Sequence, residues 1–451
     1  MEEMQTMGKY FGTDGIRGLA NETLTAERAF NVGRYLGYYY SQNGKQNILI
    51  GKDTRLSSDM LENALAAGIT SEGCNAYLAG YCPTPMISYL VQNDDFACGA
   101  MISASHNPFH DNGIKVFSKE GLKLSADIEN LIEQYIDHEV EIAYKTEDKI
   151  GKVITYPHGL EEYLAYIKEL FPLDLSGYNL AVDCANGSSS VTAEKALKAL
   201  GANLTMTHDK PDGVNINTHC GSTHPESLQE LVKNGNYDLG LAFDGDADRM
   251  MLVAPNGQLL TGDHMLYVFG RYFKNKGVLN NNTIVTTVMA NLGLFKAMER
   301  NDIHIASTQV GDKYVFECMC KENDIVGGEQ SGHIIFKEIE KTGDGLVTAL
   351  MFLRVMKETG LTALELCEGL KIYPQLLINV KVSDKDAAME DSDVKKAIEE
   401  VNSRLNGNGR ILVRQSGTEP LVRVMAEAET DEICEREVNS IVEIVKNKFG
   451  I

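Results

Sequence analysis

The stretch Cys98–Phe117 reads CGAMISASHNPFHDNGIKVF. Its apolar start, Ala100–Ile102, is typical of a short buried strand, and Ser103–Pro108 is a turn of small polar residues. A hydroxyl held on a turn at a strand end is a common way to present a nucleophile, so Ser105 is a candidate. Lys115 returns toward that hydroxyl if the intervening loop folds back. Taken alone, an ordinary surface loop explains these residues better, so the other segments must decide.

The same order of strand, polar loop and helix recurs along the chain. Further apolar runs that end in polar loops are Asn47–Gly51, Leu180–Val182, Leu239–Phe243 and Val285–Val288. Strands that alternate with helices predict α/β layers with parallel or mixed sheets, whose sites lie off the carboxyl ends of the strands. After Lys371–Gln375 the pattern changes to strand, helix, two strands and helix, which predicts an α+β unit.

The length of 451 residues exceeds what one hydrophobic core serves. We predict an α/β protein with three mixed-sheet α/β domains and a smaller α+β C-terminal domain. The predicted ranges are 1–150, 151–254, 255–370 and 371–451.

Composition excludes several classes of partner. The formal net charge is −22, which repels nucleic acid and anionic membranes, so neither is expected as a partner. There is no run of eighteen apolar residues, and the start MEEMQTMGKY lacks the apolar segment of a secretory signal. Nine cysteines without a CxxC spacing favour reduced thiols, and we expect a cytoplasmic protein.

An acidic loop, Asp244–Arg249, follows the apolar run Leu239–Phe243. Its carboxylates, Asp244, Asp246 and Asp248, are costly to hold together without a cation, and oxygen ligands favour Mg²⁺. An EF-hand is excluded, because Arg249 stands where that loop needs glycine and Pro255 where it needs glutamate. A phosphatase with Asp244 as nucleophile remains open.

Three further loops carry binding chemistry. Glycines near Arg17 allow a ligand to approach the backbone of Gly12–Gly18. Glu329, Ser331 and His333 lie in a glycine-rich loop that suits sugar hydroxyls or an amine, and a packed structural histidine explains His333 equally well. The segment around Ser416 is equipped to grip a phosphate; its candidates are Arg414, Ser416, Gly417, Thr418 and Arg423. Together the loops suggest phosphoryl transfer, which depends on positioning and charge neutralisation.

With these residues in hand, the chain resembles the α-D-phosphohexomutase superfamily from about Gly8 to its end. The motifs that carry the resemblance are Gly12–Gly18, Ile102–Pro108, Asn215–Asn217 with Cys220–His224, and Gly328–His333. Within the superfamily the chain is most similar to enzymes that interconvert glucosamine 6-phosphate and glucosamine 1-phosphate. Relatives acting on mannose and glucose phosphates usually carry Met in place of Gln330 and lack the Cys220–His224 run.

The resemblance implies four domains around a central cleft and assigns roles to the candidate residues. Ser105 would be the phosphoserine, and its phosphate would hold Mg²⁺ together with Asp244, Asp246 and Asp248. Residues matching catalytic positions are Arg17, Lys115 and His333; those matching substrate-binding positions are Arg249, Glu329, Ser331, Arg414, Ser416, Gly417, Thr418 and Arg423. Lys313 departs from the pattern, because relatives usually carry Arg there. Lysine keeps the positive charge but lacks the planar guanidinium group that can donate two hydrogen bonds to a phosphate.

The implied reaction passes the phosphoryl group of Ser105 to a sugar monophosphate. The resulting bisphosphorylated sugar, which also serves as the activating intermediate, turns end for end and returns its other phosphate. In bacteria the product feeds UDP-N-acetylglucosamine and the cell wall. The expected partners are small-molecule sugar phosphates, and a homodimer is one assembly that the sequence leaves open. The alternatives are a phosphomannomutase/phosphoglucomutase, a Mg²⁺-dependent sugar phosphatase, and a sugar-phosphate sensor without catalysis.

Overall fold

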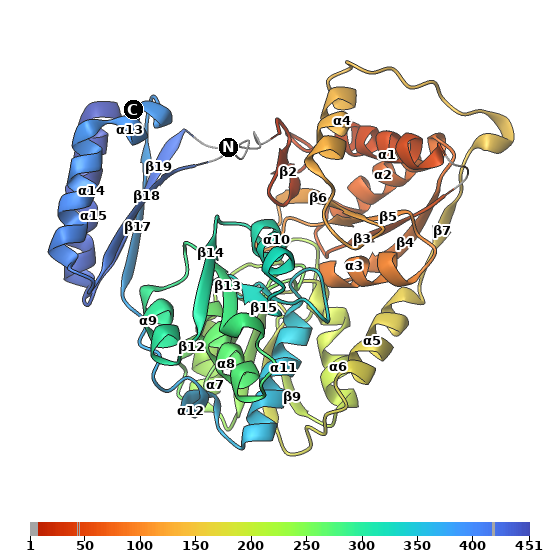
Figure 1. Ribbon diagram of the computed structural model, residues 1–451. Helices are drawn as coiled ribbons and strands as arrows, with labels where there is room; N and C mark the ends of the chain where they lie inside the picture. Colours follow the sequence, from red (N-terminus) through yellow and green to blue (C-terminus); the bar gives the residue numbers. More distant parts are fainter. Residues whose placement is uncertain (1–7, 43, 45, 417–419) are drawn as a thin grey trace. The chain divides into compact units, whose positions relative to one another are not determined.

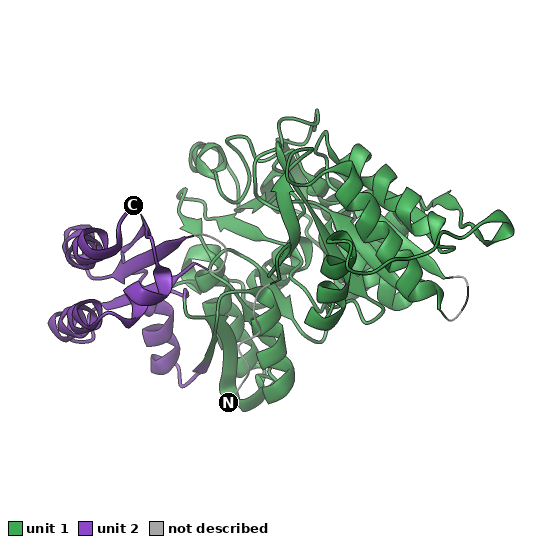
Figure 2. Cartoon of the chain, turned by 90° about the horizontal axis from the view of Figure 1, so that it is seen from above, with its two compact units in different colours: residues 1–288, 306–368 green, residues 289–305, 369–451 purple. Residues whose placement is uncertain are grey.

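The structure is a computed structural model that describes residues 8–42, 44, 46–416 and 420–451. It divides into two compact units, residues 1–288 with 306–368 and residues 289–305 with 369–451 (Figure 2). Each unit is described by itself.

The first sheet has the order β1-β2-β6-β5-β3-β4-β7. Strands β3, β4, β5 and β7 run parallel, whereas β5, β6, β2 and β1 pair antiparallel, so the sheet is mixed. Its strands are β1 (Phe11–Gly12), β2 (Gly15–Leu19), β3 (Asn47–Lys52), β4 (Asn75–Tyr81), β5 (Cys98–Ile102), β6 (Asp111–Ser118) and β7 (Val153–Thr155).

Helices cover both faces of this sheet, with α1, α2 and α4 on one face and α3 on the other (Figure 1). The helices are α1 (Ala26–Ser41), α2 (Ser58–Ser71), α3 (Thr84–Asn93), α4 (Ala126–Ile136) and α5 (Gly159–Leu170), with a 3₁₀ turn at Glu147–Lys149. Close packing of α1 on α2 depends on glycine, because a Cβ on Gly33 would lie 2.2 Å from the Leu65 carbonyl oxygen.

The second sheet has the order β12-β11-β10-β8-β9, with β9, β8 and β10 parallel and β11 and β12 antiparallel. Its elements are β8 (Asn179–Asp183), β9 (Asn203–Thr207), β10 (Leu239–Phe243), β11 (Met250–Val253), β12 (Leu259–Leu260), α6 (Ala193–Ala199) and α7 (Glu226–Asn234), with a 3₁₀ turn at Ser188–Val191. The central strand β10 is wholly buried, as its unbroken apolar sequence predicts.

The third sheet has the order β14-β13-β15-β16, with β13 and β15 parallel and β15 and β16 antiparallel. Its strands are β13 (Thr283–Thr287), β14 (His304–Thr308), β15 (Val326–Gly328) and β16 (Ile334–Phe336). The helices of this part of the chain are α8 (Gly262–Asn275), α9 (Leu292–Arg300), α10 (Asp312–Glu322), α11 (Gly345–Thr359) and α12 (Ala363–Leu366), with a 3₁₀ turn at Asn280–Asn282.

The C-terminal sheet is antiparallel, in the order β17-β19-β18. Its elements are β17 (Gln375–Lys381), β18 (Arg410–Gln415), β19 (Leu421–Glu427), α13 (Lys385–Glu390), α14 (Ser392–Leu405) and α15 (Asp431–Phe449). The predicted fold class is confirmed: three mixed α/β sheets precede a small α+β domain. In the described part of the chain, no helix has the length and apolar character needed to cross a membrane, and all nine cysteines are free thiols.

Candidate active site

Ser105 lies just beyond β5, at the carboxyl end of a parallel strand. Its φ is +53°, a left-handed conformation that is uncommon for residues other than glycine. The side chain is buried, and Oγ donates a hydrogen bond to Asp244 Oδ2 at 2.6 Å. The fold therefore joins the candidate nucleophile to the acidic loop, although 139 positions separate them in the chain.

Two side chains from different parts of the chain hold the Ser105 loop. Arg55 Nη2 donates to the carbonyl oxygens of Ser105 and Asn107 at 3.1 and 2.6 Å, and Asn217 Nδ2 donates to the same oxygens at 2.9 and 2.9 Å. The acidic loop also approaches closely, because a Cβ on Gly245 would lie 2.4 Å from the Ser105 carbonyl oxygen. These contacts fix the position of the serine backbone.

The acidic loop follows β10 directly, and its three aspartates are buried with carboxylate oxygens within 4.8 Å of one another. Burial, then the negative charges of Asp248 and Asp246, raises the pKa of Asp244 well above its ordinary value. Thr84 Oγ1 donates to Asp246 Oδ2 at 2.5 Å. Within the described ranges, Oδ1 of Asp246 and Oδ1 of Asp248 are buried without a hydrogen-bond partner.

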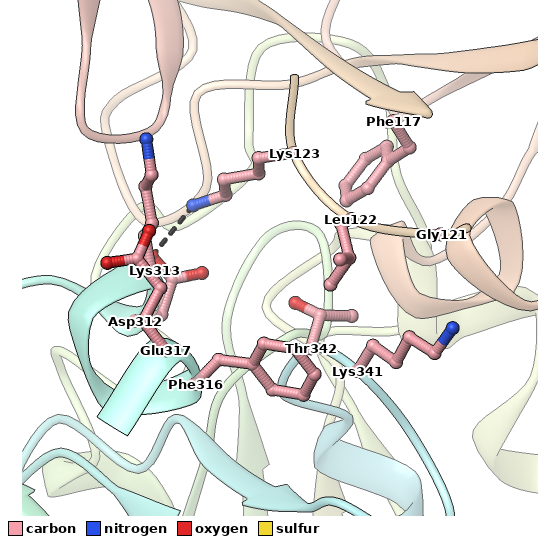
Figure 3. Close-up of a pocket in the computed structure, with 10 residues that line it drawn as sticks. All are labelled: Phe117, Gly121, Leu122, Lys123, Asp312, Lys313, Phe316, Glu317, Lys341 and Thr342. Atoms are coloured by element: carbon pink, nitrogen blue, oxygen red, sulfur yellow. Dashed lines mark hydrogen bonds and ion pairs between the residues drawn. The ribbon is translucent and has the colours of Figure 1, made fainter. Parts of the chain in front are cut away.

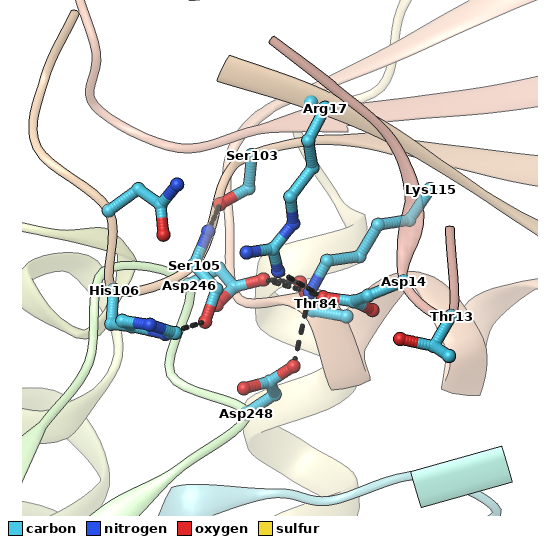
Figure 4. A network of polar contacts seen from close by, with 12 residues as sticks. Thr13, Asp14, Arg17, Thr84, Ser103, Ser105, His106, Lys115, Asp246 and Asp248 are labelled. Carbon is cyan, nitrogen blue, oxygen red and sulfur yellow. Dashed lines mark hydrogen bonds and ion pairs between the residues drawn. The ribbon is translucent and has the colours of Figure 1, made fainter. Parts of the chain in front are cut away.

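Lys115 reaches this cluster from β6, which pairs antiparallel with β5 and places Lys115 opposite Met101. The loop after Ser105 therefore folds back, and the returning strand β6 begins at Asp111. Lys115 is 1% exposed, and Nζ lies 2.8 Å from Asp246, 3.1 Å from Asp248 and 3.1 Å from Asp14 (Figure 4). Burial alone would lower its pKa, but the three carboxylates raise that pKa well above its ordinary value.

Asp14 joins the cluster to a second lysine. Its Oδ1 lies 2.8 Å from Lys123 Nζ, and Lys123 also lies 2.8 Å from Oδ1 of Asp312 at the start of α10. Arg17, from β2, donates a hydrogen bond to the other oxygen of Asp14 (Figure 4). Burial opposes ionisation of Asp14, yet the charges of Lys115, Lys123 and Arg17 hold its pKa well below the usual range.

His106 lies beside the serine, with Nδ1 3.4 Å from Ser105 Oγ and 3.1 Å from Nη1 of Arg249. Burial, followed by the charges of Arg249 and Arg17, lowers the pKa of His106 to about 4. The ring is therefore neutral near pH 7, and Nδ1 accepts from the guanidinium. Because Arg249 directly follows Asp248, its charge stands at the edge of the acidic loop.

His333 is buried between two carboxylates. Its Nδ1 lies 3.8 Å from Asp248 Oδ1, and its Nε2 lies 3.6 Å from Asp312 Oδ2. The Gly343 amide donates to Nε2 at 2.8 Å, so in the neutral ring the proton sits on Nδ1 and faces Asp248. Burial lowers the pKa of His333, but Asp248 and Asp312 outweigh it and raise that pKa overall.

The glycine-rich loop between β15 and β16 places Glu329 and Ser331 together. Glu329 accepts from the Gly311 amide at 3.1 Å and from Ser331 Oγ at 3.3 Å, and both residues are partly exposed. Lys313 lies nearby on the first turn of α10, beside a cavity of about 100 Å³ that Lys123 and Asp312 also line (Figure 3).

The C-terminal unit holds the remaining candidates. Arg414 on β18 and Arg423 on β19 are cross-strand partners. Burial, then the charge of Arg423, lowers the pKa of Arg414. Ser416 is buried, and its carbonyl oxygen accepts from Lys385 Nζ at 2.9 Å. Gly417 and Thr418 lie outside the described residues.

In the first unit the fold brings together most of the residues proposed from sequence: Ser105, Arg17, Lys115, Asp244, Asp246, Asp248, Arg249 and His333. Sequence reasoning missed Asp14, Arg55, Lys123, Asn217 and Asp312 as contributors. Asp14, Arg55 and Asn217 stand in polar loops at strand ends or within quoted motifs, which is a signal that could have found them. Lys123 and Asp312 carry no such signal, since their pairing depends on the fold.

Comparison with known proteins identifies the family. Four models of the phosphoglucomutase/phosphomannomutase type match in order: α/β/α domain I at residues 8–143, domain II at 161–257, domain III at 261–373 and the C-terminal domain at 377–444. A phosphoglucosamine mutase of Lachnospira eligens is 50% identical over 446 residues, which is 98% of this chain and 99% of that protein. The chain belongs to the α-D-phosphohexomutase superfamily.

Other phosphohexomutases agree with this placement. The phosphoglucosamine mutase of Bacillus subtilis is 47% identical over 447 residues, or 99% of this chain and 100% of that one. Among solved structures, a phosphoglucomutase/phosphomannomutase family protein from Burkholderia thailandensis superposes with a TM-score of 0.80 at 23% identity and covers 99% of this chain and 100% of that one. N-acetylphosphoglucosamine mutase from Aspergillus fumigatus, solved with GlcNAc-6P and magnesium, has a TM-score of 0.69 at 19% identity, covering 96% and 95%.

Proposed function

We propose that this phosphohexomutase is a phosphoglucosamine mutase, an isomerase that interconverts glucosamine 6-phosphate and glucosamine 1-phosphate. Full-length similarity to proteins of that name, at 50% and 47% identity, carries the assignment. The hydrogen bond of Ser105 to the acidic loop supports the chemistry, because the serine lies where a phosphoryl group and its countercharges must meet.

In the proposed mechanism Ser105 carries a phosphoryl group at the start. The bond between phosphorus and Oγ breaks, a new bond forms to the free hydroxyl oxygen of the sugar monophosphate, and that hydroxyl gives up its proton to a base in the site. The bisphosphorylated sugar then turns, its other phosphoryl group returns to Oγ, and the sugar oxygen that is released takes up a proton. Oγ of Ser105 thus donates a phosphoryl group in the first step and accepts one in the second.

The cationic side chains offset the charge of the transferring group. Lys115, Arg17 and Arg249 contact the aspartates or lie beside the serine, within the same buried network. The raised pKa of Lys115 keeps it protonated, so we assign it charge stabilisation rather than the role of base. His333, whose Nδ1 proton faces Asp248, is our candidate for proton transfer.

Mg²⁺ fits the three aspartates. Oδ1 of Asp246 and Oδ1 of Asp248 are buried and accept no hydrogen bond from any described residue, while Lys115 holds the opposite oxygens. Three carboxylates suit a hard divalent ion, and phospho-Ser105 would supply a further oxygen. When bound, the ion would neutralise charge on the phosphoryl group that is transferred.

Substrate recognition is assigned to two loops. Glu329 and Ser331 would bind the sugar, and the carboxylate suits the amine of glucosamine. Arg414, Ser416, Gly417, Thr418 and Arg423 would bind the phosphate that is not reacting. The loop must bind first one phosphate of the bisphosphorylated sugar and then the other. Its contacts must therefore recognise the charge of a phosphate rather than the shape of one end of the sugar. The two guanidinium groups on β18 and β19 meet this requirement.

Two assays test the proposal. Turnover of glucosamine phosphates is compared with that of glucose and mannose phosphates, each primed with the matching bisphosphate; a strong preference for glucose or mannose overturns the assignment. In the second assay Ser105→Ala must abolish isomerisation, whereas phosphate release that survives this change indicates a phosphatase with Asp244 as nucleophile. Binding without turnover at any Mg²⁺ concentration would indicate a sensor.

A cytoplasmic location and a homodimer complete the proposal. The nine free thiols suit a reducing compartment. Light scattering coupled to size-exclusion chromatography measures the assembly, and a monomer at all concentrations contradicts the dimer.

A further inference from the structure

A second group of metal-binding residues lies at the carboxyl end of the second sheet. Asp183 is the last residue of β8, and His208 directly follows β9, the parallel neighbour of β8. Cys220 comes from the loop that precedes α7. The carboxylate, imidazole and thiol place one ligand atom each within 4.8 Å of the others. None of the three belongs to the proposed Mg²⁺ site.

The ring of His208 is placed so that, in its neutral form, it can share a metal ion with Asp183. Nδ1 of His208 lies 3.1 Å from Oδ2 of Asp183, a distance that would permit a hydrogen bond. Among the residues that the structure describes, Nδ1 is shielded from solvent and makes no hydrogen bond of good geometry, although the neighbouring Asp183 carboxylate raises the pKa of the ring. In the neutral ring with Nδ1 unprotonated, Nδ1 of His208 and Oδ2 of Asp183 are both acceptors, and a lone pair of each could bind one metal ion placed between them.

The spacing suits a tetrahedral ion. Bonds of about 2.0–2.3 Å to nitrogen, oxygen and sulfur place ligand atoms roughly 3.3–3.6 Å apart. The separation of 3.1 Å between His208 and Asp183 is close to that value. A cysteine and a histidine are poor ligands for Mg²⁺ and good ones for Zn²⁺, which is borderline soft.

We propose that Asp183, His208 and Cys220 form a second metal site that takes Zn²⁺ or a similar transition-metal ion, with a fourth position open to water. Asp183 and Cys220 are buried, whereas the side chain of His208 is 33% exposed. The surrounding backbone orients the carboxylate: the Ala185 amide donates to Oδ1 at 2.8 Å and the Gly221 amide to Oδ2 at 3.0 Å.

The ion would brace the loop that holds the catalytic serine. Cys220 follows Asn217 by three residues, and Asn217 donates to the carbonyl oxygens of Ser105 and Asn107. Tying Cys220 to β8 and β9 restrains this loop without touching the reacting atoms. The inference concerns metal binding and does not rest on the proposed mutase activity.

Titration of the full chain with Co²⁺, in excess Mg²⁺ so that the acidic loop is filled, tests the site. We expect about one equivalent of Co²⁺ with a thiolate-to-metal absorption band in the near ultraviolet. The band must vanish in Cys220→Ser and persist in the matched control Cys318→Ser/Cys320→Ser, which removes the two more accessible thiols on α10. A band that is absent from the unmodified chain, or that follows Cys318 and Cys320, overturns the proposal.

A second variant avoids the buried thiol. His208→Gln removes a partly exposed ring and should weaken Zn²⁺ binding at least tenfold in competition with a chromophoric chelator, with the circular dichroism spectrum unchanged. His224→Gln, an exposed histidine near the same loop, serves as the control and should bind Zn²⁺ as the unmodified chain does. Equal Zn²⁺ affinity in His208→Gln and the unmodified chain overturns the site.

Discussion

Nζ of Lys115 lies 2.8 Å from Oδ2 of Asp246, and this ion pair joins the first sheet to the acidic loop of the second. Lys115 is buried and also contacts Asp14 and Asp248. The lysine therefore supplies the positive charge that lets these carboxylates be buried together, and Oδ1 of Asp246 has no hydrogen-bond partner among the described residues.

Replacing Lys115 should impair both stability and turnover. Lys115→Met leaves buried carboxylates without their cation, which costs about 3–5 kcal/mol in the absence of Mg²⁺. Lys115→Ala should lower turnover by at least about 100-fold, because charge stabilisation of the phosphoryl group is lost. Thermal melting and the coupled isomerase assay measure the two effects, with the exposed Lys119→Ala as control. Near-normal turnover in Lys115→Ala would remove this residue from the site.

Mg²⁺ should stabilise the folded chain through the acidic loop. Saturating Mg²⁺, at about 100 times its dissociation constant, adds about 2.7 kcal/mol to the stability of the protein that binds it. Asp246→Asn removes one ligand and should abolish both this gain and the activity. Differential scanning fluorimetry with and without Mg²⁺ measures the gain, and Asp127→Asn, exposed on α4, should keep it. An equal gain in Asp246→Asn would place the ion elsewhere.

Asn217 should act by positioning the serine loop. Asn217→Ala removes two hydrogen bonds to loop carbonyl oxygens, so the serine shifts relative to the acidic loop. We expect kcat to fall about 10- to 100-fold, since small misplacements of reacting groups are costly, with KM changed less than about twofold. Thr223→Ala, exposed on the same segment, should behave as the unmodified chain. A rise in KM at constant kcat would indicate substrate binding instead.

Glu329 should determine the preference for the amino sugar. Its carboxylate is partly exposed and is oriented by Gly311 and Ser331. Glu329→Ala should raise KM for glucosamine 6-phosphate at least about tenfold, the effect of losing roughly 1.4 kcal/mol, and change KM for glucose 6-phosphate less. Steady-state kinetics with both substrates give the ratio, and Glu338→Ala, exposed beyond β16, is the control. Equal changes for both substrates would exclude recognition of the amine.

Asp344 should make stability depend on pH. Its Oδ1 accepts from the Leu346 and Val347 amides at the start of α11, and Tyr163 donates to Oδ2 at 2.6 Å. Burial nevertheless raises its pKa from 3.8 to about 6. A raised carboxyl pKa means that ionisation of Asp344 destabilises the folded state relative to the unfolded state. This loss of stability is absent below about pH 4, where the carboxyl is protonated in both states. It is complete above about pH 6, where it amounts to roughly 2–3 kcal/mol.

Asp344→Asn should therefore gain stability relative to the unmodified chain as the pH rises from 4 to 7. The variant keeps an oxygen for the two amides but carries no charge. Melting temperatures of both proteins at the two pH values give the comparison, with Asp391→Asn at the start of α14 as control for loss of a helix-capping carboxylate. A difference in melting temperature that does not change with pH would contradict the expected ionisation of Asp344.

Local sequence signals predicted much of the fold. The apolar run Leu239–Phe243 coincides with β10, and the run Asn47–Gly51 lies within β3. Helix α13, Lys385–Glu390, was not predicted; Asp384 caps it, but the segment is too short to show a clear periodicity. Strand β6, Asp111–Ser118, was not predicted either, since it contains glycine and polar residues that obscure a strand pattern.

The sequence by itself determined which groups the chain offers and which of them share a loop: the three aspartates after β10, the serine on its turn, and the two arginines near Ser416. Spacing of this kind follows from backbone geometry over a few residues. Only the tertiary structure decided that Lys115 faces Asp246, that Lys123 pairs with Asp312 across 189 positions, and that Arg55 and Asn217 hold the same two carbonyl oxygens. Such pairs form because sheet order and strand direction bring distant loops to one edge, and no local pattern of residues records that outcome.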